Sequence, residues 1–198
     1  MLLIVGKSAA GKDTIAEELE RRGYSSVISH TTRPSRGAGD RHVFVTSGEA
    51  DLLWDDSVAR TIFDGHRYFA TKDDVRKADL YVVDPAGAYE MTSKMPDTDF
   101  VICYVTAADA RRREMAIARE VDRDKAARTF DARERDEQLP FVKFEREIAM
   151  WLNGNPIDIP ANVKAIVTIE NDYRPESIAR MADEVEKAMR ETAADGRA

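Results

Sequence analysis

The chain has a single cysteine, Cys103, which stands inside the apolar run 100–105. One cysteine cannot form an internal disulfide, so the sequence predicts a protein of the reducing cytoplasm with a buried, inert thiol. No apolar stretch is long enough to cross a membrane, and no leader precedes the first predicted strand, so we expect no membrane partner. The three histidines do not stand at metal-site spacing with cysteine or carboxylates, and no Ser-His-Asp arrangement is indicated.

The chain has fewer basic than acidic residues, which gives a formal net charge of −7. This balance argues against a nucleic acid polymer held over a broad surface. The chain has 198 residues, of which 43% are hydrophobic, so it can bury one core and is expected to form a single domain.

Short apolar runs alternate with helical patterns along the chain, which predicts an α/β fold with a parallel sheet covered by helices on both faces. The expected sheet has five strands, at 1–6, 26–29, 80–84, 100–105 and 164–169. Helices are expected at 12–22, 47–55, 72–78, 86–94, 107–118, 124–151 and 175–193. The small, polar tail 192–198 is expected to fray.

The first predicted strand runs directly into the sequence GKSAAGKDT, after which an amphipathic helix begins. Glycines allow a tight turn whose backbone N–H groups point at an anion, and the helix adds its positive N-terminal end. The pattern is typical of a loop that binds the phosphates of a nucleoside triphosphate, with the lysine reaching the outer phosphates. The predicted ATP-binding residues of the loop are Gly6, Ser8, Ala9, Ala10, Gly11, Lys12, Asp13 and Thr14. Asp13 stands where Ser or Thr usually follows the lysine, and Asp-Thr resembles the variant found in nucleoside monophosphate kinases.

A second stretch, 29–45, follows the second predicted strand and mixes arginines, hydroxyls and glycines. Arg33 and Arg36 can fork around one phosphate, because the planar guanidinium binds oxygens in pairs. A solvated loop is the alternative interpretation of this composition. In its order, Ser-x-Thr-Thr-Arg-x-x-Arg followed by a turn and Phe-Val, the stretch resembles the acceptor loop of guanylate kinases.

The resemblance to guanylate kinases extends along most of the chain. The segment 65–71 resembles the family's Gly-x-x-Tyr-Gly-Thr, 82–87 resembles a strand ending in Asp-x-x-Gly, and 168–172 resembles the Asn-Asp beside adenine. The resemblance implies that Asn171 lies by the donor base. It implies the following acceptor-binding residues: Ser29, Arg33, Arg36, His42, Tyr68, Thr71, Asp84 and Gly87.

Several positions depart from the family pattern. Ala59 stands where the guanine-binding Glu is expected, and Val82 replaces the first of two aspartates. His42 replaces a tyrosine, Thr71 comes one place late, and the bulky Phe69 is expected to narrow the acceptor pocket. Guanine requires a carboxylate acceptor, which Asp40, Asp64 or Asp84 could supply, so the acceptor base stays open.

A magnesium ion is expected with the nucleotide. Asp84 ends a predicted central strand, where ligands of open α/β sheets collect, although a strand-end cap is the alternative. Together with Asp13 and Thr14 it is predicted to hold Mg²⁺, largely through water.

Eight arginines fall between Arg111 and Arg135. A salt-bridged, solvated helix face is one interpretation, because acidic residues interleave them. Phosphoryl transfer also needs positive charge over the migrating group, which related kinases supply with an arginine-bearing lid. We therefore predict that Arg113 binds ATP on the donor side of the lid. The predicted catalytic residues are Lys12, Arg119, Arg123, Arg128 and Arg133.

The resemblance implies a three-layer P-loop kinase fold in one domain, with a core (1–32, 79–118, 136–191), an acceptor-binding region (33–78) and a lid (119–135). It implies Mg²⁺-dependent transfer from ATP to a nucleoside monophosphate, GMP or dGMP first. The alternatives are a kinase for another deoxynucleotide or a sugar phosphate, or an inactive binding module. The expected partners are small nucleotides, and a monomer or homodimer is expected.

Overall fold

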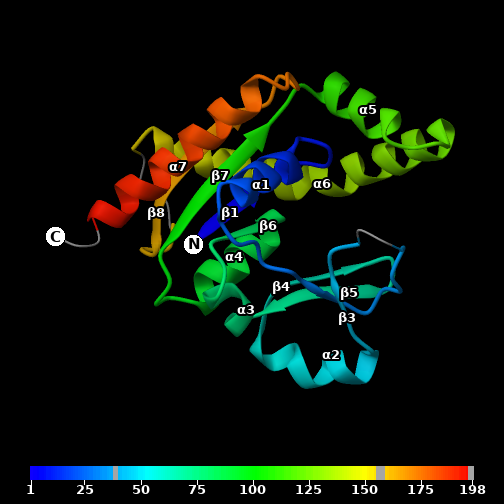
Figure 1. Ribbon diagram of the computed structural model, residues 1–198, viewed down its shortest axis with the longest axis horizontal. Helices are drawn as coiled ribbons and strands as arrows, with labels where there is room; N and C mark the ends of the chain where they lie inside the picture. The colour runs from blue at the N-terminus through cyan, green and yellow to red at the C-terminus, as the bar shows by residue number, and fades with distance from the viewer. Residues whose placement is uncertain (38–39, 155–158, 196–198) are drawn as a thin grey trace.

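The computed structural model describes residues 1–37, 40–154 and 159–195. Within these ranges the chain forms two four-stranded sheets (Figure 1). The first is parallel throughout and has the order β6-β1-β7-β8. Its strands are β1 (Leu2–Val5), β6 (Leu80–Val83), β7 (Phe100–Thr106) and β8 (Val163–Glu170). The predicted α/β class is therefore confirmed.

The prediction of five strands in this sheet is wrong, because the segment 26–29 forms only an isolated bridge among the described residues. Ser26 pairs with Leu80 beside β6, and the N–H of Val27 donates to the carbonyl of Leu80 at 2.9 Å. The backbone then turns away, since the carbonyl of Ser29 accepts from Val43 in the second sheet. The segment therefore lies beside β6, where a fifth strand would pair, but only Ser26 and Val27 bond to that strand.

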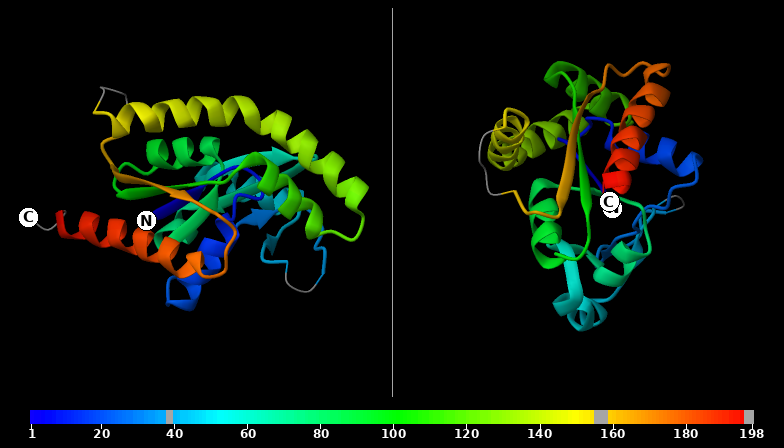
Figure 2. Two further views of the ribbon diagram at one scale, coloured as in Figure 1. Left: turned by 90° about the horizontal axis from the view of Figure 1, so that it is seen from above. Right: turned by 90° about the vertical axis from the view of Figure 1, so that its left-hand side faces the viewer.

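Helices cover both faces of the parallel sheet, and the right panel of Figure 2 shows α6 on one side with α7 and α1 on the other. The helices are α1 (Lys12–Arg21), α2 (Ser47–Leu53), α3 (Lys72–Arg76), α4 (Pro85–Lys94), α5 (Asp109–Ala118), α6 (Arg123–Leu152) and α7 (Ser177–Asp195). All the predicted helices are confirmed, with ends shifted by two residues or fewer. The tail was predicted to fray from 192, but residues 192–195 continue α7, and 196–198 lie outside the described residues.

Two hydrophobic layers sandwich the parallel sheet. Along β1, Leu2 and Ile4 pack with α1 and α7, whereas Leu3 and Val5 pack with α4 and α6. All four side chains are fully buried. A strand buried on both faces needs this continuous apolar run, and it fixes the point where the following loop emerges.

The second sheet has the order β3-β2-β5-β4 and was not predicted. Its strands are β2 (His30–Thr31), β3 (Val43–Phe44), β4 (Ser57–Phe63) and β5 (His66–Thr71), and a 3₁₀ turn covers Trp54–Asp56. Asp64 and Gly65 join β4 to β5 with φ values of 51° and 75°. Two positive φ angles are what a two-residue hairpin loop requires, and Asp-Gly is a strong signal for it.

Helix α6 has two differently supported halves. From Phe141 onward it packs on the sheet through buried Phe144 and Ile148, and its carboxylates Glu145 and Glu147 accept hydrogen bonds from two tyrosine hydroxyls. Its first half pairs with α5 as a hairpin that extends from the core (Figure 1). Pro140 stands at the junction and has no N–H to donate to the preceding turn.

Candidate functional site

The predicted phosphate loop lies between β1 and α1 and contains a tight backbone turn. Ala9 and Gly11 adopt φ values of 60° and 99°, and the N–H of Ala10 donates to the carbonyl of Lys7 at 3.1 Å. The Lys12 ammonium donates to the same Lys7 carbonyl at 3.0 Å. The lysine therefore curls back over the loop, on the side where the anion of such a loop binds.

Two positions of the loop require glycine, because neighbouring atoms leave no room for a Cβ. A Cβ at Gly6 would lie 2.5 Å from the carbonyl oxygen of Val105, and one at Gly11 would lie 2.1 Å from the amide nitrogen of Asn171. Both distances are too short for real contacts, and Gly11 also has its positive φ. The loop is thus packed tightly against the ends of β7 and β8.

The pKa of Lys12 is lowered by burial, while the nearby carboxylates of Asp13 and Glu137 act in the opposite direction. The positive charges of Arg112 and Arg133 add to the lowering of the pKa, so both guanidinium groups lie near the Lys12 ammonium. A partly buried cation with two arginines nearby is an environment in which a polyphosphate is stabilised.

Asn171 and Tyr173 donate hydrogen bonds to backbone carbonyls of the loop. The Asn171 amide donates to the carbonyl of Ala10 at 2.9 Å, and its oxygen accepts from the N–H of Tyr173 at 2.8 Å. The Tyr173 hydroxyl donates to the carbonyl of Ala9 at 2.8 Å. Asn171 is 7% exposed, so its amide serves the loop itself in this structure.

We expect Asn171→Ala to lower the free energy of unfolding by about 1–3 kcal/mol, because it leaves the buried Ala10 carbonyl without its donor. Thermal denaturation measures this. Asn153→Ala is the matched control, since the Asn153 amide also donates to a backbone carbonyl but lies at the exposed end of α6. Equal losses in the two variants would contradict a specific role beneath the loop.

A cavity of about 550 Å³ opens in front of the loop, between the two sheets and α6. It brings together these predicted site residues: Gly6, Ser8, Lys12, Arg33, Arg36, His42, Tyr68, Asp84 and Arg133. Other predicted residues do not line it, namely Ala9, Ala10, Gly11, Asp13, Thr14, Ser29, Thr71, Gly87, Arg113, Arg119, Arg123, Arg128 and Asn171. Both predicted anion sites therefore face one space.

Arg33 and Tyr68 form the wall opposite the loop. The Arg33 guanidinium is 8% exposed, pairs in bidentate fashion with Asp40 at 2.8 and 2.9 Å, and donates to the Tyr68 hydroxyl at 3.1 Å. The N–H of Arg36 donates to the same Asp40 carboxylate at 2.9 Å. His42 lines the cavity with its ring hydrogen-bonded to Ser29, which lies behind it.

Asp84 caps helix α4 at the edge of the cavity. One carboxylate oxygen accepts from the N–H of Gly87 at 2.6 Å and the other from the Thr61 hydroxyl at 3.1 Å. Thr71 likewise caps α3, through a hydrogen bond from the N–H of Asp74. Asp84 thus combines the capping role with a place in the cavity wall.

Phe69 was expected to narrow the acceptor pocket, and this is wrong. Its side chain is fully buried, stacks on His30 and meets Trp54 edge-on. Alternation along β5 turns Phe69 into the small sheet's own core, while its neighbour Tyr68 faces the cavity.

Of the predicted lid arginines, Arg133 reaches the cavity, where its guanidinium lies over the Phe63 ring at 5.2 Å. Arg119, Arg123 and Arg128 are exposed on the α5–α6 hairpin. Arg113 pairs with Asp131 between α5 and α6 at 3.0 Å, so it holds the hairpin together.

Two important residues were not predicted. Arg112 is 1% exposed and donates to the Ser8 carbonyl at 3.0 Å and to Glu134 at 2.8 Å. Glu137 accepts from both the N–H and the hydroxyl of Ser8, at 2.8 and 2.5 Å. Sequence reasoning counted Arg112 among eight similar arginines, and no local pattern distinguishes it from Arg111 or Arg113.

The predicted metal residues do not form a cluster of their own. Within the described part of the chain, no group of three or more His, Cys, Asp or Glu side chains is arranged to hold a metal ion. Asp13 is exposed on the first turn of α1 and does not line the cavity, whereas Asp84 does. These oxygens suit Mg²⁺ chemically, with phosphates and water as its remaining ligands.

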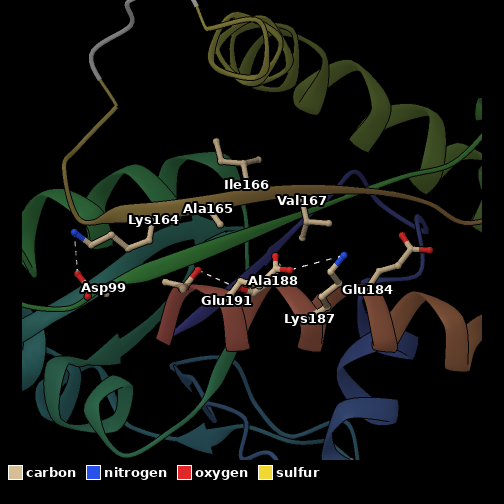
Figure 3. Close-up of a pocket in the computed structure, with 10 residues that line it drawn as sticks. Asp99, Lys164, Ala165, Ile166, Val167, Glu184, Lys187, Ala188 and Glu191 are labelled. Carbon is tan, nitrogen blue, oxygen red and sulfur yellow. Dashed lines mark hydrogen bonds and ion pairs between the residues drawn. The ribbon is translucent and has the colours of Figure 1, made fainter. Parts of the chain in front are cut away.

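A larger groove, of about 910 Å³, lies between β8 and α7 (Figure 3). Four of its five charged side chains pair with one another, Lys164 with Asp99 at 3.4 Å and Lys187 with Glu191 at 3.8 Å. It contains none of the predicted site residues, so the smaller cavity is the candidate site.

Neither a protein-family model nor a curated protein matches the chain. Among solved structures, a guanylate kinase from Anaplasma phagocytophilum is similar at 16% identity, with 96% of this chain and 84% of that chain covered and a TM-score of 0.49. An uncharacterized protein from Eubacterium ventriosum is similar at 12% identity, with 94% and 96% covered and a TM-score of 0.40. Likeness at this level does not establish an activity.

None of the described helices has the length and apolar character needed to cross a membrane.

Proposed function

We propose that the protein is a nucleoside monophosphate kinase that transfers the γ-phosphoryl group of ATP to the phosphate of a nucleoside monophosphate, GMP or dGMP first. The observation that carries the proposal is the shared cavity, which has Lys12 and the phosphate loop on one wall and Arg33, Arg36 and Tyr68 on the other. The two sites proposed to bind phosphate both carry positively charged side chains and open into one cavity. This arrangement suits a reaction that transfers a phosphoryl group from one phosphate to another.

Catalysis in this proposal comes from positioning and charge. Lys12 and Arg133 neutralise the migrating phosphoryl group, while Arg33 and Arg36 orient the acceptor phosphate for attack. The acceptor phosphate is itself the nucleophile, so no general base is required. The hairpin of α5 and α6 acts as the lid, bringing Arg119, Arg123 and Arg128 over the nucleotide and excluding water.

A magnesium ion bound with ATP would supply positive charge that neutralises the negative charge developing during transfer. The Thr14 hydroxyl lies in the first turn after Lys12, and Asp84 lies at the edge of the cavity, where it can bind the ion's water shell. Each Asp84 oxygen accepts one hydrogen bond from the protein, which leaves lone pairs for water.

A second candidate, a kinase for another deoxynucleotide or a small sugar phosphate, is favoured by Ala59 and Val82, which stand where the resembled family has carboxylates. Val82 lines the cavity with Ile62, Phe63 and Phe141, so one part of the wall is apolar, while Asp84 and Asp136 supply carboxylates elsewhere on it. An inactive binding module is less consistent with the chain, because a module that binds a peptide has no use for a triphosphate loop with its lysine in place.

Steady-state assays with ATP and GMP, dGMP, AMP, dAMP, CMP, dTMP and a panel of sugar phosphates test the proposal. We expect kcat/KM for the best purine monophosphate to exceed the next best by no more than roughly a few hundredfold. The reason is that an apolar wall discriminates by shape, worth about 1–3 kcal/mol. A preference for GMP of many thousandfold would show that Asp40, Asp64 or Asp84 reads guanine, and no transfer to any acceptor would refute the kinase.

A further inference from the structure

The wall that is proposed to bind the acceptor phosphate already holds an anion of the protein. Asp40 receives two hydrogen bonds from the Arg33 guanidinium and a third from the N–H of Arg36. These donors hold the pKa of the Asp40 carboxyl well below its usual range. A carboxylate bound by a guanidinium fork and a backbone N–H has the contacts that a phosphate makes in the same place.

The phosphate loop is occupied in the same way. Glu137, from α6, receives hydrogen bonds from the N–H and the hydroxyl of Ser8, both on the cavity side of the loop. A neighbouring glutamate, Glu134, lies 3.5 Å from the Lys7 ammonium and pairs with Arg112. The loop therefore binds carboxylates that come from the lid helix.

We propose that Asp40 and Glu137 are internal competitors that occupy the two phosphate sites of the substrate-free protein and are displaced by the acceptor and by ATP. This inference rests on the proposed function for the identity of the two sites. Its physical basis is that Arg33 and Ser8 cannot give the same N–H and O–H groups to a carboxylate and to a phosphate at once.

The exchange determines specificity. A ligand must offer at least as much negative charge as the carboxylate that it replaces, so phosphates displace Asp40 and Glu137 where neutral alcohols or amides do not. Displacement of Glu137 also removes the hydrogen bonds between α6 and Ser8, which leaves Glu134 with Lys7 as the direct contact of this helix with the loop. ATP binding is thereby coupled to a change in the lid helix.

Binding of inorganic phosphate, followed by ³¹P NMR, tests the acceptor side. We expect Asp40→Asn to bind phosphate about tenfold more tightly than the wild type, because one charge-assisted interaction no longer competes. Asp97→Asn, in the exposed turn before β7, removes the same charge far from the site and should bind as the wild type does. Weaker or unchanged binding by Asp40→Asn would show that Asp40 instead shapes the site, and Asp40→Ser, which keeps an acceptor for the Arg36 N–H, repeats the test if the asparagine variant unfolds.

Calorimetric titration with Mg·ADP tests the loop side without any turnover. We expect Glu137→Gln to bind about tenfold more tightly than the wild type, and Glu191→Gln, on the exposed end of α7, to be unchanged. Unchanged affinity of Glu137→Gln overturns the inference and leaves the kinase proposal standing. A wild-type protein that binds neither phosphate nor Mg·ADP overturns both.

Discussion

Replacing Lys12 by alanine is expected to abolish phosphoryl transfer while leaving the fold intact. The Lys12 ammonium is a partly buried cation at the phosphate loop. Its only hydrogen bond among the described residues goes to the Lys7 carbonyl, so the loop keeps its other supports. Loss of a charge that acts mainly on the transition state should cost on the order of 3 kcal/mol or more, which is roughly a hundredfold or more in kcat. Steady-state kinetics with the best acceptor measure it.

The matched control is Lys187→Ala, which removes a 72% exposed lysine from α7, outside the cavity. It should retain wild-type kcat, and thermal denaturation should give similar midpoints for the control and the Lys12 variant. Near-normal turnover by Lys12→Ala would falsify the assignment of the loop as the donor site.

Arg112→Met is expected to have the largest effect on stability. The substitution keeps the aliphatic stem but removes a buried guanidinium that binds the Ser8 carbonyl, Asp109 and Glu134. Breaking a buried charge network at one partner should cost on the order of 3 kcal/mol in the free energy of unfolding, and ADP affinity should fall because the loop loses its tie to α5. Urea denaturation and calorimetry measure the two effects.

Arg113→Met gives the contrast on the same helix. Arg113 and its partner Asp131 are each 47% exposed, and an exposed pair of this kind contributes about 0–1 kcal/mol. If the two variants lose the same stability, burial of Arg112 is not what makes it important.

Much of the fold followed from local patterns. The apolar runs of β1, β6, β7 and β8 and the helical periodicity between them identified the parallel sheet, because strands buried on both faces need uninterrupted apolar residues. The second sheet escaped this reasoning, since β2 and β3 are two residues long and β4 carries polar and charged residues at its centre. Its one clear signal was Asp64-Gly65, which favours a two-residue hairpin loop.

The residues of the candidate site also divide into those that local sequence patterns predict and those that they do not. Lys12, Arg33, Arg36 and Tyr68 were predicted and line one cavity, because each is specified by a short motif next to a strand. Arg112 and Glu137 depend on how α5 and α6 pack against the loop, 104 and 129 residues away in sequence. Contacts over such separations leave no local pattern, so only the folded chain reveals that these two side chains bind Ser8.

The proline in α6 gives this helix a position at which it can bend. Pro140 separates the half that packs on the sheet from the half that carries Arg133, Arg128 and Arg123, and one backbone hydrogen bond is missing at that point. Arg123 stands about 25 Å along the helix from Pro140 at ~1.5 Å per residue, so a tilt of roughly 10° carries it about 4 Å. Arg133, about 10 Å from Pro140, moves less than 2 Å under the same tilt. In the proposed kinase, a single small rotation would therefore move the distant arginines much further than the arginine nearest the loop.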